Sequence, residues 1–325
     1  MSTATPPARP GARPRTTGAG RPAANRAGAL TAAAVTGALL LTGCGSAAPS
    51  GGDAGQGSDP RSQLPEQVRA AGVLRIGADL TYAPVGFKSE GNRPDGLDVD
   101  LADALGNVLG MRVQFSDVPF NRLRLGLQAR EYDLVMSGMT DTPQRRDGVD
   151  EEARKVNDGL DFVDYFVTGT SVVVAKGNPQ RISGLDDLCG RTVAVQRETT
   201  QAALLERQTG VCEKTGRKLT VTETDTDDQA LALVGQGRAA ADLNDAPVAA
   251  HAVKNGRGGT QFQVVGAQLQ VAPYGIAFAK QDTALRDAVA KALDQLIRSG
   301  EYDRILAKWG LTDGAVQSAV VNGGF

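Results

Sequence analysis

The sequence predicts an α/β fold made of two lobes. Short apolar runs of strand type alternate with helical patterns along most of the chain, as they do in α/β units built around a mostly parallel sheet. The alternation begins at residue 73 and starts afresh at residue 171, which indicates two such lobes. With 325 residues, of which 41% are hydrophobic, the chain is long enough to bury one or two cores.

The first series of elements starts with Val73–Ala78, an apolar run that predicts a buried strand. Helical spacing predicts a helix over Val99–Gly110, with Asp98 as its N-cap and Gly110 as its stop. A strand over residues 112–118, a helix over 122–129 and a strand over 133–137 follow. The series therefore has the order strand, helix, strand, helix, strand.

The second series starts with strands at Ser171–Lys176 and Thr192–Gln196. Thr200–Gly210 has a helical pattern that its own glycine should end. The remaining elements are a strand over residues 219–224, a helix over 227–237, strands over 239–243 and 273–280, and helices over 283–299 and 302–309. In sheets of this kind ligands bind beyond the carboxyl ends of the strands, so site residues are expected there.

The first 43 residues differ from the rest of the chain. They carry five arginines, no acidic residue, and an apolar run over Ala27–Leu41 that is short for a membrane span, which is typical of an export signal. The alternative is a disordered tail beside a buried helix. The run ends in Leu41–Cys44, which resembles the bacterial lipobox and predicts a lipid on Cys44. Residues 44–63 are rich in Gly, Ser, Ala and Asp and predict a flexible tether.

Charge and cysteine content restrict the function classes. Without the first 43 residues the chain has 30 basic against 37 acidic residues, a formal net charge of −7, which argues against a nucleic acid as partner. In an exported chain Cys189 and Cys212 are expected to form a disulfide, with two free buried thiols as the alternative. His251 is the only histidine, so no metal site is expected.

The stretch Ser137–Arg146 follows the strand that ends at Ser137 and so lies at its carboxyl end. Thr142 and Pro143 fit an N-cap and the first position of a helix. Backbone N–H groups, a helix N-terminus and the guanidinium of Arg145 would then converge on one point, as a carboxylate site requires. The residues alone leave a capped surface helix with solvated arginines as an equal alternative.

The second series offers a complementary set. Thr199 and Thr200 are cap candidates where a strand leads into a helix, and Asp245 follows another strand. An anion site on one lobe and a carboxylate on the other would suit a zwitterion that lies between them. Taken singly, Asp245 also fits a cap of the helix after Pro247.

Seven stretches of the sequence carry a family resemblance: Leu74–Phe87, Gly96–Leu105, Tyr132–Arg145, Thr192–Gln201, Asp242–Ala249, Tyr274–Phe278 and Gly300–Gly310. In this order they resemble the extracellular solute-binding proteins of polar-amino-acid ABC transporters, over nearly all of residues 64–311. The cysteine pair is similar to the actinobacterial lipoprotein branch.

The resemblance implies a periplasmic-binding-protein fold of type II, in which two α/β lobes are joined by two crossing hinge segments. The crossings would lie near residues 168–171 and 266–273. One lobe would comprise residues 64–168 and 272–325, and the other residues 169–271.

The resemblance also implies how an amino acid would be held by its backbone groups. Arg145 would bind the α-carboxylate, helped by Thr140, Thr200 and the backbone of Gly138. Asp245 would bind the α-ammonium.

For the ligand side chain, the resemblance implies that Tyr82 and Phe120 enclose it and that Asp79 lies at its far end. The complete expected set of ligand-binding residues is Asp79, Tyr82, Phe120, Ser137, Gly138, Thr140, Arg145, Gln196, Thr199, Thr200 and Asp245.

Two features depart from the family's pattern. Glu198 stands where the family commonly has a glycine whose N–H approaches the ligand. Glu198 therefore either weakens the second lobe's share of carboxylate binding or places a charge at the rim of the cleft. The segment Asp147–Phe166 is longer than usual and predicts an acidic surface excursion.

Asp79 with two aromatic walls favours a cationic ligand side chain, that of arginine or lysine. Glutamine or glutamate is the next expectation, since Gln196 and Asn244 would suit an amide. We expect the chain to capture its ligand by closing the two lobes and to deliver it to an ABC permease in the membrane.

The ATPase of such a transporter should be another chain, because this sequence contains no G-x-x-x-x-G-K-[ST] phosphate loop. No cofactor is expected, and a lipid on Cys44 should hold the protein at the outer face of the cell membrane. A lipoprotein that senses amino acids would use the same binding chemistry. A dehydratase-type enzyme on the same fold is the third class, which the scarcity of catalytic groups disfavours.

Overall fold

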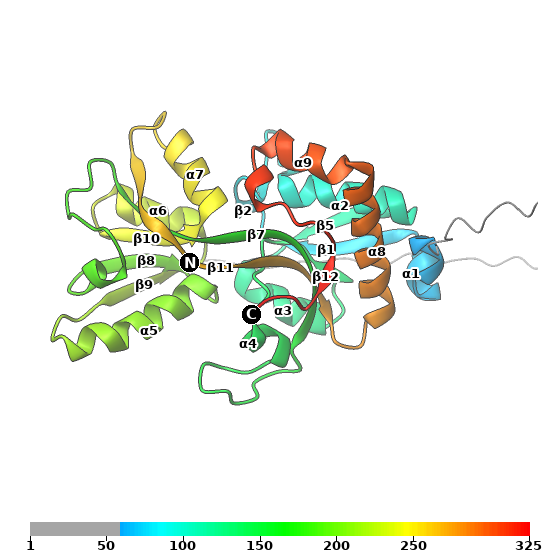
Figure 1. Cartoon of the computed structure of the whole chain (residues 1–325), viewed down its shortest axis with the longest axis horizontal. Helices are drawn as coiled ribbons and strands as arrows, with labels where there is room; N and C mark the ends of the chain where they lie inside the picture. The colour runs from blue at the N-terminus through cyan, green and yellow to red at the C-terminus, as the bar shows by residue number, and fades with distance from the viewer. Residues whose placement is uncertain (1–58) are drawn as a thin grey trace, which may run out of the picture. The chain divides into compact units, whose positions relative to one another are not determined.

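The computed structural model describes residues 59–325 (Figure 1). One mixed sheet extends across both lobes of this part of the chain. In the order in which they pair, its strands are β5 (Arg112–Asp117), β1 (Val73–Ala78), β6 (Leu134–Val135), β11 (Phe262–Ala279), β7 (Leu160–Ala175), β10 (Ala241–Asp245), β8 (Thr192–Gln196) and β9 (Thr220–Thr224). The short strand β12 (Val320–Val321) also pairs with β7. A second, small sheet contains β2 (Thr81–Tyr82), β3 (Gly86–Lys88) and β4 (Pro94–Asp95).

Helices accompany the strands in the alternation that the sequence predicts. In chain order they are α1 (Glu66–Ala71), α2 (Leu97–Leu109), α3 (Phe120–Gln128), α4 (Pro143–Asp147), α5 (Thr200–Lys214), α6 (Asp227–Gly235), α7 (Ala246–Asn255), α8 (Thr283–Ser299) and α9 (Glu301–Trp309). Short 3₁₀ turns form η1 (Pro60–Gln63), η2 (Leu185–Leu188) and η3 (Thr312–Gly314).

The long strands β7 and β11 join the two lobes. They pair antiparallel with each other, and they carry β1, β5 and β6 on one side of the sheet order and β8, β9 and β10 on the other. Within each of these two groups the strands are parallel. In Figure 1 α2, α3, α8 and α9 lie with the first group and α5, α6 and α7 with the second. The predicted α/β fold with two lobes and two crossing segments is therefore confirmed.

The crossings differ from the expectation in one respect. We expected separate strands to begin at Ser171 and Pro273, but β7 and β11 continue through both crossings. The ladder between them changes register around Leu269 in β11. Such bulges bend a strand locally, which suits a segment that passes from one lobe to the other. The expected lobe boundaries, after residues 168 and 271, fall inside these strands and stay a prediction.

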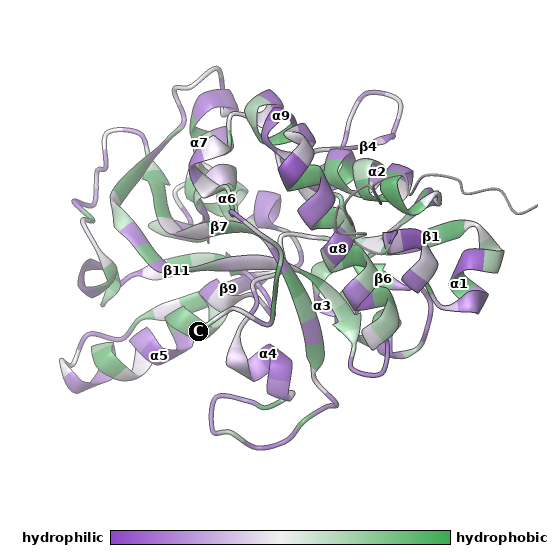
Figure 2. Ribbon diagram, turned by 45° about the vertical axis from the view of Figure 1, so that its right-hand side comes forward, coloured by the Kyte–Doolittle hydropathy of each residue, from purple (hydrophilic) through white to green (hydrophobic). Residues whose placement is uncertain are grey.

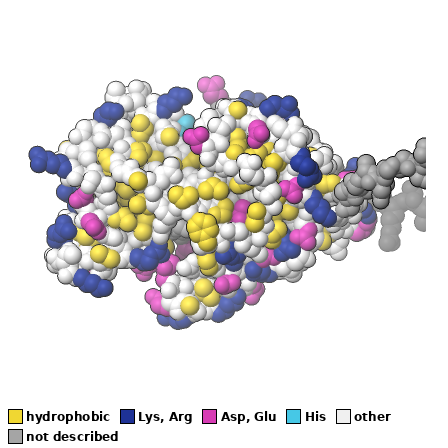
Figure 3. All heavy atoms as spheres, viewed as in Figure 1, with side chains coloured by type: hydrophobic (Ala, Val, Ile, Leu, Met, Phe, Trp, Pro, Cys, Tyr) yellow, Lys and Arg dark blue, Asp and Glu magenta, His cyan; other side chains and the backbone are white. Residues whose placement is uncertain are grey.

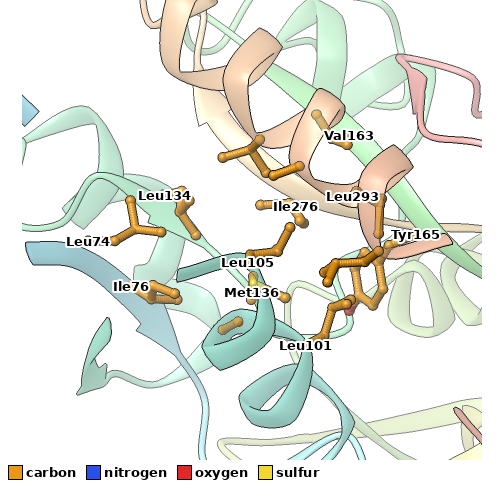
Figure 4. Close-up of a cluster of buried hydrophobic side chains, with 14 of the residues drawn as sticks. Leu74, Ile76, Leu101, Leu105, Leu134, Met136, Val163, Tyr165, Ile276 and Leu293 are labelled. Carbon is orange, nitrogen blue, oxygen red and sulfur yellow. The ribbon is translucent and has the colours of Figure 1, made fainter. Parts of the chain in front are cut away.

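Each lobe has its own buried apolar core. In the first lobe the core contains Leu74, Ile76, Leu101, Leu105, Leu134, Met136, Val163, Tyr165, Ile276 and Leu293 (Figure 4). In the second lobe it includes Val172, Val174, Leu188, Val193, Val195, Leu204, Leu205 and Leu243. Burying an aliphatic or aromatic side chain of this kind stabilises a fold by roughly 1.5–3 kcal/mol relative to leaving it exposed.

The sequence spacing of α8 shows how a helix contributes to such a core. Its buried residues are Leu285, Ala288, Val289, Ala292, Leu293 and Leu296. Intervals of three and four place these side chains on one face of the helix. Figure 2 shows the same mixture of hydrophobic and hydrophilic residues along the other covering helices.

Two predicted capping residues do not cap their helices. The helix α2 begins at Leu97 with Gly96 as its N-cap, so Asp98 lies inside the first turn and is not the cap. Its carboxylate instead accepts hydrogen bonds from Gly138 N (2.9 Å) and Tyr165 Oη (2.5 Å). The helix α5 continues through Gly210 to Lys214, so Gly210 does not end it.

The first described residues are already folded. Pro60–Gln63 form η1, and Pro60 and Leu64 are buried. We had expected residues 60–63 to belong to the flexible tether. The export signal, Cys44 and the rest of the tether lie outside the described residues. Within residues 59–325, no helix is both long and apolar enough to cross a membrane.

Cys189 and Cys212 form the expected disulfide. Cys189 directly follows η2, and Cys212 lies in the last turns of α5. Both residues are buried in the core of the second lobe. The bond therefore ties the C-terminal half of α5 to the loop before β8.

Candidate functional site

Twelve residues from both lobes line one small cavity. They are Asp79, Tyr82, Phe120, Ser137, Gly138, Thr140, Arg145, Gln196, Thr199, Thr200, Gln201 and Asp245. The set includes all eleven residues that the sequence analysis named, together with Gln201. The free space that they enclose is about 20 Å³, roughly the room that one water molecule needs.

The topology explains why residues so far apart in sequence meet here. Asp79 directly follows β1, and the segment with Ser137 follows β6, whose strand is parallel to β1. In the second lobe Gln196 and Asp245 are the last residues of the parallel strands β8 and β10. The cavity thus lies at the carboxyl ends of strands from both lobes, as expected for an α/β sheet.

Asp79 is buried, with only 3% of its surface exposed, and its carboxylate accepts four hydrogen bonds. Its Oδ1 accepts from the N–H (3.1 Å) and the hydroxyl (2.6 Å) of Thr81. Its Oδ2 accepts from Phe120 N (3.2 Å) and, across the two lobes, from Gln196 Nε2 (2.9 Å). Burial raises the pKa of Asp79 above its usual value, and these hydrogen bonds oppose the rise.

Arg145 reaches both lobes with its guanidinium group. Nη1 donates to the carbonyl oxygen of Thr140 (2.9 Å) in its own lobe, and Nη2 donates to the carbonyl oxygen of Glu198 (3.1 Å) in the other. The guanidinium carbon lies 5.5 Å from the centre of the Phe120 ring. Burial lowers the pKa of Arg145 to about 10, so the group keeps its charge at neutral pH. A guanidinium has five N–H donors, and these two bonds leave others for a ligand.

The local structure around Arg145 agrees with part of the expectation. Thr142 is the N-cap of α4, its Oγ1 accepts from Arg145 N (3.2 Å), and Pro143 is the first helical residue. The helix has only five residues, however, so it adds little dipole of its own. The N–H of Gly138 donates to Asp98, so Gly138 cannot offer this N–H to a ligand carboxylate.

Asp245 is buried and bonded to both lobes. Its Oδ2 accepts from Tyr82 Oη (2.9 Å), and its own N–H donates back to that hydroxyl oxygen (3.1 Å). Its Oδ1 accepts from Gln201 Nε2 (2.7 Å). Asp245 occupies the N-cap position of α7, but its side chain makes no cap bond. Burial raises the pKa of Asp245, and Arg145 and these hydrogen bonds oppose the rise.

Two threonines open α5 beside the cavity. Thr199 is the N-cap, and its Oγ1 accepts from Ala202 N (3.1 Å) and donates to the carbonyl oxygen of Gln196 (2.7 Å). The hydroxyl of Thr200 donates to Gln201 Oε1 (3.2 Å). Of the two cap candidates, Thr199 is therefore the N-cap, and Thr200 is the first residue of the helix.

The two departures from the family's pattern have clear places. Glu198 has a φ of +63°, the backbone conformation that favours glycine. Its side chain is exposed and does not line the small cavity, so its charge lies at the rim. The predicted surface excursion ends before Leu160, because residues 160–166 belong to the buried strand β7. Before that strand, Glu151 Oε2 accepts from Arg207 Nη1 of α5 (2.8 Å), which adds an ion pair between the lobes.

Gln201 is the lining residue that the sequence analysis missed. Its amide bonds Asp245 and the hydroxyl of Thr170 (3.1 Å) on β7, so it links α5, β10 and a crossing strand. Gln201 follows Thr200 at the start of α5, and this position in the sequence could have identified it as a lining residue. Asn244, in contrast, does not line the cavity, because its Nδ2 donates to the buried Asp227 and Asp242.

Comparisons with known proteins agree on one family. The family described as bacterial extracellular solute-binding proteins, family 3, matches residues 74–312. The chain is similar to the arginine-binding protein ArgT of Corynebacterium glutamicum, with 31% identity over 264 residues, which are 81% of this chain and 82% of that protein.

Solved structures similar to this chain include an ancestral arginine-binding protein bound to arginine and an ancestral arginine-binding protein bound to glutamine. Both are 33% identical to this chain, with TM-scores of 0.65 and 0.63. The matches cover 73% of this chain and 98% and 97% of the two solved chains.

Proposed function

Since the chain belongs to the bacterial extracellular solute-binding proteins, family 3, we propose that it binds a polar L-amino acid with a cationic side chain, arginine or lysine. The observation that carries this proposal is the charge of the cavity lining. Asp79 and Asp245 are acidic, and Arg145 is the basic residue among the twelve. The lining therefore has a net charge of about −1 when these groups are ionised.

The charge of the ligand decides how well this lining is neutralised. The α-carboxylate and α-ammonium of an amino acid cancel, so a basic side chain brings the sum of ligand and lining to zero. Glutamine leaves one uncompensated negative charge, and glutamate leaves two. Because an unpaired charge is costly in a cavity that excludes water, the basic ligand is favoured.

Each end of the ligand has a matching group. Arg145 would bind the α-carboxylate with the N–H groups that its two carbonyl bonds leave over, helped by the hydroxyl of Thr200 if this hydroxyl exchanges its bond to Gln201 for one to the ligand. Asp245 would bind the α-ammonium. Asp79 would receive the side-chain cation, between Tyr82 and Phe120 as apolar walls.

The mechanism follows from the bonds that cross between the lobes. Gln196 bonds Asp79, Tyr82 bonds Asp245, and Arg145 bonds the Glu198 carbonyl, so the same groups close the cavity and face a ligand. A ligand that contacts both lobes stabilises the closed form over the open one by its differential contacts. Bends at the crossing strands would provide the hinge.

A second ligand, glutamine, is favoured by a specific observation. One solved structure similar to this chain is described as an ancestral arginine-binding protein bound to glutamine. The side-chain amide of Gln196, which lines the cavity, could pair with a ligand amide. Glutamine therefore belongs in every binding experiment as the comparison ligand.

The family works outside the cytoplasm, and this chain is an extracytoplasmic protein. We propose that a lipid on Cys44 anchors it to the outer face of the cell membrane and that it delivers its ligand to an ABC permease with a separate ATPase subunit. An amino-acid sensor would use the same cavity with another partner. Neighbouring genes for a permease and an ATPase would favour transport.

Calorimetry with the twenty L-amino acids tests the binding proposal. We expect arginine or lysine to bind with a micromolar or lower Kd. Arg145→Ala should weaken this binding at least a hundredfold, because a buried charge-assisted pair is lost. The exposed Arg122 of α3 provides the control, since Arg122→Ala removes the same charge away from the cavity.

Unchanged binding by the Arg145→Ala variant would show that Arg145 does not bind the ligand carboxylate. Conversion of the bound amino acid into another compound, followed by mass spectrometry, would favour the dehydratase-type enzyme instead. If glutamine binds tightly and arginine and lysine do not, glutamine becomes the proposed ligand.

A further inference from the structure

The C-terminal segment, residues 320–325, is attached to β7 of the first lobe. Val320 and Val321 form β12 and pair antiparallel with β7. Asn322 continues the attachment, because its N–H donates to the carbonyl oxygen of Phe162 (3.1 Å) and its Oδ1 accepts from Phe162 N (2.8 Å). The segment is thus placed by regular backbone bonds.

Beyond Asn322, two backbone N–H groups of the segment are directed at buried carboxylates. Gly323 N donates to Asp164 Oδ2 (2.9 Å), and Gly324 N donates to Asp141 Oδ2 (2.9 Å). Asp141 is fully buried, and its other oxygen accepts from Arg146 Nη1 (2.8 Å). A buried carboxylate that loses a hydrogen-bond donor is destabilised, because water cannot replace the lost bond. The bond from Gly324 N therefore helps to hold the Asp141 side chain in its observed position.

Asp141 lies between the two residues that hold Arg145. The carbonyl oxygen of Thr140 accepts from Arg145 Nη1, and Thr142 Oγ1 accepts from Arg145 N. The N–H of Asp141 itself donates to the carbonyl oxygen of Pro273 (2.9 Å) on β11. A displacement of Asp141 would therefore move these two acceptors of Arg145, whereas its third acceptor, the carbonyl oxygen of Glu198, lies in the other lobe.

A second observation is that the last residue of the segment lies near the proposed ligand site. Phe325 lines, together with Arg145, Thr200 and Val271, a hollow of about 1190 Å³ that shares several residues with the small cavity. Phe325 is 87% exposed. Figure 3 shows hydrophobic side chains gathered around the place where Figure 1 marks the C-terminus.

We propose that the C-terminal segment is a positioning element of the ligand site. By donating to one carboxylate oxygen of Asp141 while Arg146 donates to the other, it sets the orientation of Arg145 and thereby the affinity for a ligand carboxylate. Gly323 and Gly324 do not line the small cavity, so the effect passes through Asp141. This inference rests on the proposed function only for the identity of the bound group, an amino-acid carboxylate.

The variant Gly324→Ala tests the proposal with one methyl group. A Cβ at Gly324 would overlap the carbonyl oxygen of Asp141, so the segment must move away. We expect the Kd for the preferred amino acid to rise at least fivefold. The matched control is Gly184→Ala in the second lobe, where a Cβ meets no atom within 4 Å, and its Kd should stay at the wild-type value.

A double-mutant cycle tests the route through Asp141. Asp141→Asn keeps the shape of the side chain but can accept only one of the two donors well. If the segment acts through Asp141, Gly324→Ala combined with Asp141→Asn weakens binding no more than the stronger single change. Losses that multiply would overturn this route.

Hydrogen exchange separates positioning from general stability and does not need a ligand. Without ligand, Gly324→Ala should speed the exchange of amides in residues 141–147 while those of α5 keep their rates. A variant with a lower Tm but unchanged Kd and unchanged exchange would overturn the proposal. If wild-type protein binds no amino acid, the proposed function fails, and the exchange rates still decide whether the segment holds this loop.

If Gly324→Ala does not fold, a chain that ends at Asn322 serves as the second variant. It keeps β12 and the bonds to Phe162, and it removes Gly323, Gly324 and Phe325, and with them the two N–H donors to Asp164 and Asp141. A Kd equal to that of the wild type would overturn the proposal, and a fivefold rise would support it.

Discussion

Asp79 shows at the scale of one residue how a charge can choose between similar ligands. Its carboxylate is buried and already accepts four hydrogen bonds, one of them from the amide of Gln196 in the other lobe. An amide offers Asp79 a dipole, whereas a ligand ammonium or guanidinium would offer a full charge in a medium of low dielectric. Discrimination at Asp79 should therefore follow the charge of the ligand side chain more than its size.

The variant Asp79→Asn measures this discrimination. It keeps the shape of the side chain and removes the charge, so arginine or lysine should bind at least tenfold more weakly. The Kd of glutamine should change by less than about threefold, because an amide needs no counter-charge. Titration calorimetry with both ligands checks the two values, and Asp303→Asn on the exposed face of α9 is the control. Equal losses for both ligands would mean that Asp79 supports the cavity without choosing the ligand.

At the scale of elements, α5 connects the ligand site to the core of its lobe. Its N-cap Thr199 and its first residues, Thr200 and Gln201, line the cavity, and Cys212 near its other end is bonded to Cys189. The covalent bond and the cavity thus lie at opposite ends of one helix. This arrangement separates what holds the helix in the lobe from what faces the ligand.

Replacing both cysteines by alanine should lower the free energy of unfolding and leave ligand binding nearly unchanged. A closed loop with a sequence separation of 23 residues corresponds to roughly 3 kcal/mol on the chain-entropy model. Urea unfolding measures the free energy, and calorimetry at 25 °C should give a Kd within about twofold of the wild type. A large rise in Kd with little loss of stability would contradict this separation of roles.

The elements also show which features can be predicted from sequence. The strands β1 and β8 and the helix α8 have the predicted bounds, since local periodicity and capping residues determine them. The strands β7 and β11 extend further than predicted, because pairing with each other stabilises residues that lack a strand pattern. The two-residue strand β12 was not predicted, since it depends on a partner more than 150 residues away in sequence.

All eleven residues that the sequence analysis named line one cavity. Most of them stand at strand ends or helix starts, and Asp79, Tyr82 and Phe120 were named by the family resemblance. That these residues bind a ligand stays a prediction. What the sequence could not supply is the pairing of side chains across the lobes. Examples are the bond of Gly138 N to Asp98, which removes that N–H from the site, and the role of Gln201 beside Asp245.

At the scale of the whole molecule, several buried carboxyl groups have pKa values far above their usual range. Burial is the main cause, and it raises the pKa of Asp98 to about 7, that of Asp164 to about 7 and that of Asp227 to about 8. In the unfolded chain the same groups titrate near pH 4. Between about pH 4 and pH 7 the folded protein therefore holds more protons than the unfolded one. His251, whose pKa burial lowers, acts in the opposite direction as a single group.

The free energy of unfolding should therefore fall as the pH rises from 5 to 8. In this range the carboxyls lose protons in the folded state, whereas in the unfolded state they have already lost them. For each group, the free energy of unfolding falls by about 1.4 kcal/mol per unit of difference between its folded and unfolded pKa, before the structure relaxes. Asp98→Asn removes one such group while its amide oxygen can still accept from Gly138 N, so this variant should show a smaller fall. Urea unfolding at pH 5, 6, 7 and 8 measures the slope, with Asp303→Asn on the exposed face of α9 as the control. A stability that rises over this range would mean that the buried carboxyls are ionised in the folded protein and that other groups compensate their charge.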